Sequence, residues 1–188
     1  MVKQSNNLIA TIDTSLITIE VDNEEFGFDT ASQLAVEPEI EEQDAVRLII
    51  KGVLRAQKLG ESILTGNTIT LTDNVFNPEL VLVLQGGTIR YDDVDATKVI
   101  GYTPPAANAT AKGETFKLNA YTAQYNAAGQ IVQYEKITYP NCLGRPVAFG
   151  STDGEFRVSE YTIVSAADID EAPYDINYVE ELPVLTTT

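Results

Sequence analysis

Apolar and polar residues alternate with a period of two along several short stretches of the chain. The alternating stretches are 15–21, 68–72, 115–121 and 155–164. This period is typical of β-strands that bury one face against a core. Several short strands at such spacing predict a mainly β domain, built as a β-sandwich or a barrel-like sheet.

Residue pairs that favour tight turns separate these stretches. They are Lys51-Gly52, Gly66-Asn67, Gly86-Gly87 and Asp153-Gly154. Glycine adopts the positive φ that tight hairpin turns require, so each pair predicts a reversal of the chain.

Residues 46–58, VRLIIKGVLRAQK, fit two elements. Four basic residues fall at helical spacing, whereas Ile49, Ile50 and Val53 favour strands on either side of Lys51-Gly52. Gly52 would weaken a helix interior, so the hairpin is the preferred interpretation.

One short helix is predicted at 78–85. Asn77 is suited to cap its start, Pro78 to its first position and Glu79 to its positive dipole end, and Gly86 to its termination in the left-handed conformation. The residues between are apolar on every side, which predicts a helix buried on most sides and leaves a buried strand as the alternative.

Residues 121–139 predict a hairpin that turns at 126–129, with Tyr125 opposite Gln130. In that register both faces carry large apolar or aromatic side chains. One face holds Tyr121, Ala123, Tyr125, Val132, Tyr134 and Lys136, and the other holds Thr122, Gln124, Ile131, Gln133, Glu135, Ile137 and Tyr139. A sheet with one wet face normally shows a cleaner alternation.

Two acidic stretches fit no regular element. Residues 22–45 are predicted to form a long loop or arm, interrupted by Pro38, and residues 168–188 a C-terminal arm. The whole chain, 1–188, is otherwise read as a single domain. The first stretch is expected to be mobile in the monomer and ordered on assembly, with an acidic loop packed on its own domain as the alternative.

Composition and charge argue against several classes of function. The chain has 188 residues, 44% hydrophobic, and a formal net charge of -16. Nucleic-acid backbones and anionic lipids are bound through basic residues, so tight binding of either is not expected. No apolar run reaches the roughly 20 residues of a membrane helix, and the first 15 residues do not resemble a signal peptide. Cys142 is the only cysteine and is expected to be a small packed hydrophobe.

The sequence contains no recognisable catalytic or ligand-binding motif. It has no histidine, no glycine-rich phosphate loop and no singled-out pair of carboxylates. We therefore expect no enzymatic activity, no cofactor and no metal site.

Five runs in the chain resemble a known family. They are TLTDNVFNPELVLVLQGGTI (70–89), GYTPP (101–105), YTAQYNAAGQIVQYEKITYPNCLGRPV (121–147), DGEFRVSEYTIVS (153–165) and LP (182–183). Their order is similar to that of the major tail tube proteins of tailed bacteriophages and of prophage tail-like particles of Gram-positive bacteria.

The resemblance implies a β-sandwich-like tail tube fold with a small flanking helix and extended arms. Six copies would form a ring, and rings would stack into a tube through which DNA passes without specific binding. The partners would be further copies and other tail proteins, such as a tape measure, a baseplate and, if the tail is contractile, a sheath, with no membrane. The particle would be a virion tail assembled in the host bacterial cytoplasm. Another tail component of the same fold, or an adhesin or carbohydrate-binding module, stays as the alternative.

Under this reading a hairpin occupied on both faces packs its own core on one side and meets a neighbour on the other. The side chains expected at contacts between subunits are aromatic or aliphatic and come from the two arms and the hairpin: Phe26, Phe28, Leu34, Val36, Ile40, Tyr125, Tyr134, Tyr174 and Tyr178.

Overall fold

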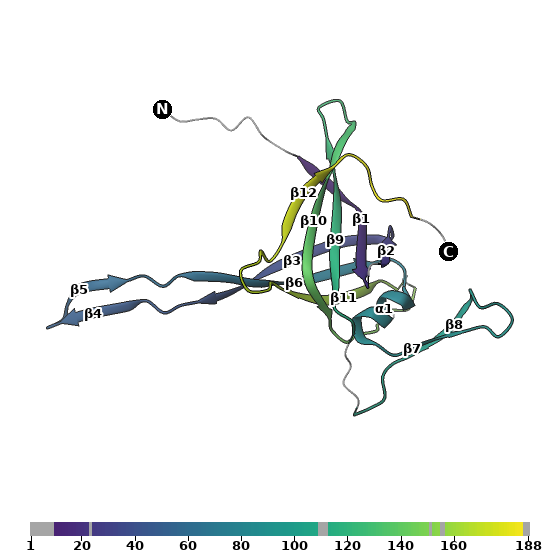
Figure 1. Cartoon of the computed structure of the whole chain (residues 1–188), viewed down its shortest axis with the longest axis horizontal. Coiled ribbons are helices and arrows are strands. Elements are labelled where there is room, and N and C mark those ends of the chain that lie inside the picture. The colour runs from purple at the N-terminus through teal and green to yellow at the C-terminus, as the bar shows by residue number, and fades with distance from the viewer. Residues whose placement is uncertain (1–9, 23, 109–112, 151, 155–156, 186–188) are drawn as a thin grey trace.

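A computed structural model describes residues 10–22, 24–108, 113–150, 152–154 and 157–185. Within them the chain forms strands and one helix (Figure 1). The elements are β1 (Thr11–Val21), β2 (Glu24–Phe28), β3 (Ala31–Glu42), β4 (Val46–Ile50), β5 (Val53–Lys58), β6 (Ser62–Asp73), α1 (Pro78–Gln85), β7 (Thr88–Tyr91), β8 (Val99–Thr103), β9 (Phe116–Tyr125), β10 (Ile131–Gly144), β11 (Ser159–Ala166) and β12 (Asp175–Val179). The prediction of a mainly β fold with one short helix is confirmed.

One large sheet forms the body of the molecule. Its strand order is β2-β1-β9-β10-β11-β6-β3, with β12 paired to β10 and two separate two-stranded hairpins, β4-β5 and β7-β8. The end strands β2 and β3 are consecutive in the chain and joined only by Asp29 and Thr30. The sheet therefore curls round until its two ends are linked by this short connection, which gives the barrel-like shape.

β10 makes the turn between the two halves of this sheet. It pairs with β9 from Ile131 to Tyr139, and the register then shifts. At Cys142 it pairs with Phe116 of β9 and also begins its pairing with β11, at Ser165. Between Tyr139 and Cys142 lie Pro140, which has no N–H to donate, and Asn141 with a φ of 46°. This irregularity bends the strand as a bulge does and directs its last residues into the opposite half of the sheet.

The core lies between the two halves. Ile17 and Ile19 of β1 and Leu118 of β9 come from one half, and the other half supplies the buried odd-numbered positions of β11 and β6. These positions are Tyr161, Ile163, Ile69 and Leu71. The period-2 pattern predicted this burial for 15–21, 68–72 and 115–121. In the fourth stretch the strand begins at Ser159, and residues 155–156 lie outside the described residues.

Helix α1 packs against the same core. The side chain of Asn77 accepts hydrogen bonds from the N–H groups of Glu79 (2.9 Å) and Leu80 (3.2 Å), as an N-cap does. Pro78 stands at the first position, and Leu80, Val81 and Leu84 are fully buried. Gly86 ends the helix with a φ of 75°, but its ψ of -163° lies outside the left-handed helical region that was expected.

The acidic segment 22–45 does not form the predicted loop. It contains β2 and β3, which pair with β1 and β6, and Phe28 is buried in the core. Phe26, Leu34 and Val36 pack against that core. The prediction failed because it counted only the local scatter of apolar residues, whereas β3 gains its partner from β6, about 35 residues downstream.

The hairpin at 121–139 exists, but its register differs from the prediction. Tyr125 pairs with Ile131 instead of Gln130, and after a bulge Gln124 pairs with Gln133. Asn126 closes the turn by accepting hydrogen bonds from the N–H groups of Ala128 and Gln130. A shift by two residues beyond the bulge preserves which side chains share a face, so the two faces were assigned correctly along most of the hairpin.

The chain itself covers part of both hairpin faces. One face joins the core through Ala120 and Tyr139. On the opposite face, where Tyr121 and Leu16 pair, the C-terminal segment crosses the sheet and Leu185 approaches Gly27 (Figure 1). The C-terminal arm 168–188 is thus anchored on its own domain through β12 and Leu185, with residues 186–188 outside the described residues.

The predicted turns have mixed outcomes. Lys51 and Gly52 both have positive φ, 50° and 78°, and join β4 to β5 as expected of a type I′ hairpin turn. Gly66 and Asn67 instead lie inside β6, and the prediction of a turn there is wrong. The side chain of Asn67 is buried, and its amide is satisfied there because it donates to the Ser165 Oγ and the Pro173 carbonyl, both at 3.2 Å.

Gly144 permits the close approach of β10 to helix α1. A Cβ added there would lie 2.4 Å from the Leu84 Cα, inside backbone contact distance. Gly150 has nothing within 4 Å of its added Cβ and serves as a matched control. We expect Gly144→Ala to lower the free energy of unfolding by about 1–3 kcal/mol through overpacking and Gly150→Ala to change it by less than about 0.5 kcal/mol. Urea denaturation measures both, and equal stability of the two variants would contradict the packing described.

Burial also perturbs two ionisable groups of β10. It raises the pKa of the Cys142 thiol to about 12, and burial together with nearby Tyr174, Cys142 and Glu135 raises the pKa of Tyr139 to about 12. The ordinary values are 9.0 and 10.0. Cys142 is fully buried, as expected of a packed hydrophobe.

These two shifts predict loss of stability at alkaline pH. The unfolded chain releases both protons near their ordinary values while the folded chain retains them, so stability is complete below pH 9 and falls as pH rises toward 12. Thermal unfolding measured from pH 8 to 12 should show this decline, with a shallower slope for Cys142→Ala. An identical slope for the variant would assign the decline to other groups.

Candidate interaction surfaces

A long two-stranded ribbon leaves the body of the molecule. Its base is the outer part of β3 and β6, beyond Glu37 and Gly66, and its tip is the β4-β5 hairpin (Figure 1). At about 3.3 Å per residue the ribbon spans roughly 40 Å from Glu37 to Ile50. We call residues 46–58 the basic arm.

Every residue of the basic arm is exposed, including its large apolar side chains. Ile50 faces Val53 across the turn, and Ile49 faces Leu54. A two-stranded ribbon has no second layer to bury such side chains and is marginally stable alone. This arm therefore presents an apolar surface that the described chain does not cover.

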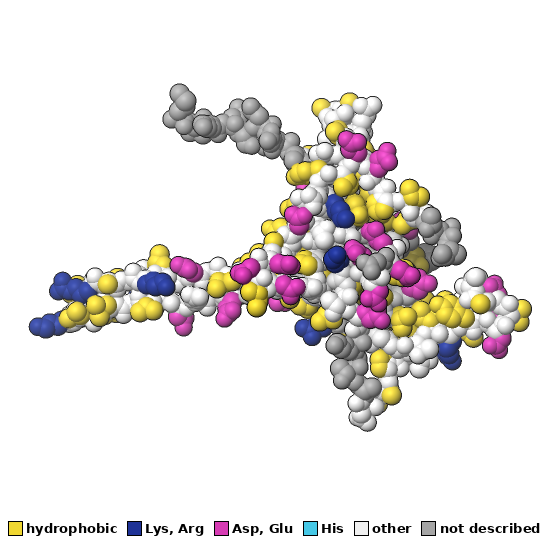
Figure 2. Space-filling view, in the orientation of Figure 1, with side chains coloured by type: hydrophobic (Ala, Val, Ile, Leu, Met, Phe, Trp, Pro, Cys, Tyr) yellow, Lys and Arg dark blue, Asp and Glu magenta, His cyan; other side chains and the backbone are white. Residues whose placement is uncertain are grey.

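The basic arm also carries positive charge on an acidic protein. Arg47, Lys51, Arg55 and Lys58 are four of the twelve basic residues, and the arm has no acid. None of the four forms an ion pair with any residue that the structure describes. Dark blue side chains gather at this tip in Figure 2, whereas magenta side chains spread over the body. The tip is thus suited to contact an acidic surface.

A second hairpin, β7-β8, projects on the other side of the body and has an acidic tip (Figures 1 and 2). We call residues 88–103 the acidic arm. Its loop holds Asp92, Asp93 and Asp95, with one ion pair of 3.8 Å from Lys98 to Asp92. Hydrogen bonds from the Thr97 hydroxyl and N–H lower the pKa of the Asp95 carboxyl.

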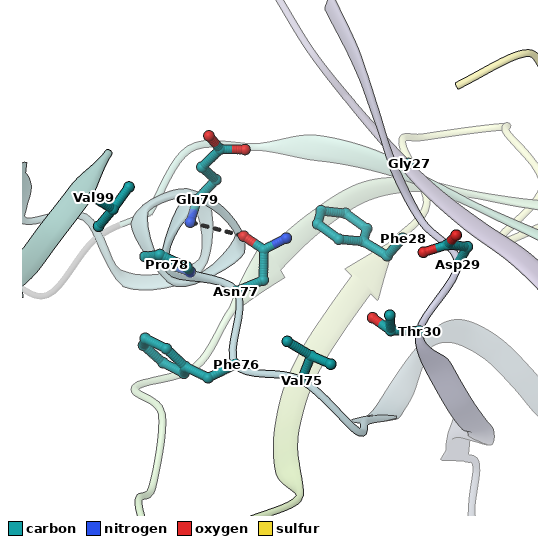
Figure 3. Close-up of a pocket in the computed structure, with 10 residues that line it drawn as sticks. All are labelled: Gly27, Phe28, Asp29, Thr30, Val75, Phe76, Asn77, Pro78, Glu79 and Val99. Carbon is teal, nitrogen blue, oxygen red and sulfur yellow. Dashed lines mark hydrogen bonds between the residues drawn. The ribbon is translucent and has the colours of Figure 1, made fainter. Parts of the chain in front are cut away.

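Two adjoining cavities lie where the acidic arm meets the body. One, of about 360 Å³, lies between β2, the start of α1 and Val99 (Figure 3). The other, of about 210 Å³, is lined by Phe26, Leu82, Val83, Ile89 and Tyr91. Phe28 and Glu79 line both, so we treat the two as one groove.

The groove has an apolar floor and two acidic residues. Phe28, Phe76 and Val75 line it from β2 and the segment before α1. Figure 3 shows Phe28 between Asp29 and Glu79. Both acidic residues are exposed, and neither carboxylate receives an ion pair or hydrogen bond from the described residues. Such a groove can bind an apolar segment that carries positive charge.

Among the described residues, no group of three or more acidic or cysteine side chains could hold a metal ion. Cys142 is buried and its pKa is raised, which removes the thiolate that a nucleophile needs. No helix among them is long and apolar enough to cross a membrane.

The side chains predicted for contacts between subunits divide into two groups. Phe26, Phe28, Leu34 and Val36 pack in or against the chain's own core, and Tyr134 is half-buried. The others are exposed to solvent: Ile40, Tyr125, Tyr174 and Tyr178. Ile40 lies on the ribbon, Tyr125 near the β9-β10 turn, and Tyr174 and Tyr178 lie just before β12 and within it.

The sequence prediction did not include the basic and acidic arms among the contact sites. The hairpin at 46–58 was expected, but its exposure was not. A usable signal was present, because four basic residues without an acid stand out in a chain of net charge -16. The β7-β8 hairpin had no comparable signal, since its strands have only four and five residues.

No family model and no curated protein matches the chain. Among solved structures it is similar to a chain of the extended sheath-tube complex of the PVC extracellular contractile injection system, with 17% identity, 88% of this chain and 90% of that chain covered, and a TM-score of 0.41. It is also similar to a chain of the tube-terminating cap of the anti-feeding prophage, with 16% identity, 93% of this chain and 95% of that chain covered, and a TM-score of 0.43. A chain of the baseplate of that particle is similar with 14% identity, 91% of this chain and 95% of that chain covered, and a TM-score of 0.37. These scores and identities are too low to establish a shared fold or a family.

The exposure of the basic arm predicts where a protease cuts first. Trypsin cleaves after Lys and Arg, and four such sites lie on this uncovered ribbon. Limited digestion of dilute protein should cut within 46–58 before Lys117 in β9 or Lys136 in β10, and mass spectrometry of the fragments identifies the first cut. Early cleavage in β9 or β10 would contradict the exposure of the arm.

Proposed function

We propose that this chain is a structural subunit of a phage-type tail tube, which assembles with further copies of itself and performs no catalysis. The observation that carries the proposal is the pair of hairpin arms, 46–58 and 88–103, which project from a well-packed body with apolar side chains in solvent. The sequence resemblance at 70–89 and 121–147 points to the same family.

Uncovered apolar surface favours association of this chain with further copies. Soluble monomers rarely expose contiguous apolar patches unless these are binding sites. On the basic arm Val46, Leu48, Ile49, Ile50, Val53 and Leu54 are each about half exposed or more. The end strands β2 and β3 add open sheet edges, which neighbouring copies would cover by sharing strands.

In the proposed assembly six copies form a ring and rings stack into a hollow tube. The contacts would be heterologous, closing into a ring in one direction and repeating openly along the axis. Other tail proteins, such as a tape measure, a baseplate and, in a contractile tail, a sheath, would contact this tube. The tube would be built in the host bacterial cytoplasm as part of a virion tail.

The charge of the chain suits passage of DNA through such a tube. Each copy has a formal net charge of -16, so a ring would be strongly acidic. Acidic side chains that face a bore repel phosphates and leave few cations to hold them, which lets the genome slide.

Two alternatives stay open. A tube terminator or baseplate adaptor would have the same body and arms but would close the end of a tube instead of continuing it. An adhesin or carbohydrate-binding module would use exposed tyrosine rings as ligand platforms and would stay monomeric. Of the tyrosines expected in that role, Tyr121 is buried, Tyr134 is half-buried and Tyr125 is exposed.

Self-assembly is tested by sedimentation and negative-stain electron microscopy at rising protein concentration. We expect rings or tubes, favoured by added salt because screening weakens the repulsion between copies of net charge -16. A variant in which Asn-Gly replaces residues 46–58 should fold, since that pair closes a two-residue hairpin turn, but should assemble poorly. Monomer alone at every concentration and salt would exclude the tube subunit and favour the binding module.

A further inference from the structure

The two ends of this molecule complement each other in charge and in polarity. The basic arm and the acidic arm project from opposite sides of the body (Figure 1). The groove with Asp29 and Glu79 lies at the foot of the acidic arm, where β7 and β8 contribute Ile89, Tyr91 and Val99 to its lining. A positive apolar tip and a negative apolar groove thus exist on the same chain and face away from each other.

The tip cannot reach the groove of its own chain. The ribbon is paired from Val36–Ile69 in the body out to Glu42–Ser62, with a bulge after Glu39. The Gln43 N–H then donates to the Glu61 carbonyl (3.0 Å), and the separate β4-β5 hairpin extends in the same direction (Figure 1). A paired ribbon of this length extends away from the body and does not fold back across it. A basic arm that occupies this groove must therefore come from a second copy of the chain.

We infer that the groove is the docking site for the basic arm of a second copy of this chain. The pairs Ile50/Val53 and Ile49/Leu54 supply the apolar tip, and the exposed side chains of Val75 and Val99 supply apolar surface in the groove. The exposed ammonium of Lys51 and guanidinium of Arg55 meet the exposed carboxylates of Asp29 and Glu79. This inference rests on the proposed self-assembly and specifies which two surfaces meet.

Charge complementarity gives the contact its selectivity. Copies of net charge -16 repel one another in most orientations, and the basic arm is the segment where positive charge is concentrated. Opposite charges across an interface favour the matched approach and penalise the others. The contact is heterologous, because tip and groove are different surfaces, so each copy offers one free tip and one free groove to the next.

The test uses two charge reversals at exposed residues. Lys51→Glu places a negative tip against the acidic groove, and Asp29→Lys places a positive groove against the basic tip. Each variant alone should self-associate about tenfold more weakly than the original chain. Arg145→Glu makes the same change in net charge as Lys51→Glu at another exposed site and should have little effect. Sedimentation equilibrium measures all four proteins, and thermal unfolding confirms that each is folded.

Mixing the two variants gives the decisive result. In a 1:1 mixture the negative tip of Lys51→Glu matches the positive groove of Asp29→Lys, and the remaining tip and groove match as in the original chain. Association should return in the mixture although each variant fails alone. If the original chain assembles and the variants assemble as well as Arg145→Glu, this docking site is wrong and the tube proposal stands. If the original chain stays monomeric throughout, both fail.

A second groove variant provides an independent test in case Asp29→Lys is folded but is not rescued by Lys51→Glu. Glu79→Lys reverses charge at the other carboxylate of the groove, on helix α1 instead of the β2-β3 link. It should also weaken self-association and also be rescued by Lys51→Glu. Rescue with neither groove variant would overturn the pairing of these surfaces.

Discussion

The bend in β10 is the constraint on which the rest of the structure depends. A single sheet encloses a core when it bends so that its two halves face each other. β10 belongs to both halves, and its irregularity at Pro140 and Asn141 provides this bend. Beyond the bend, Gly144 allows the strand to lie directly against helix α1. The two halves then face each other across Leu118, Tyr161 and Ile163, and the helix closes the remaining side with Leu80, Val81 and Leu84.

The same geometry leaves the arms outside. The core ends where β3 and β6 pass Val36 and Ile69, yet both strands continue to Glu42 and Ser62. From there on no second layer covers the ribbon, because the sheet halves enclose only the space between them. Apolar residues such as Ile40, Ile49 and Leu54 therefore stay in solvent for geometric reasons, and burying them requires another molecule.

The sequence predicted the elements whose signals are local. The cap at Asn77, the turn at Lys51-Gly52 and the alternation in β1 and β9 each act within a few residues, and the structure reproduces them. The failures have non-local causes. The stretch 22–45 becomes strand because β6 and β1 supply its partners, and Gly66-Asn67 stays extended because Ser165 and Pro173 satisfy the Asn67 amide. The exposed arms were missed for the same reason, since exposure depends on where the other layers end.

Acidic and basic side chains occupy different parts of the molecule. A uniform negative charge would keep copies apart and would carry no information about orientation. Here the body holds the acids, and four cations without an acid stand on a tip about 40 Å from the core. At physiological salt a charge is felt over only about 8 Å, so the tip acts on whatever surface it reaches and is little affected by the acids of its own body. The ribbon carries the basic tip farther from the body than salt allows charges to act. One acidic chain can therefore repel its copies in most orientations and still attract them through this tip.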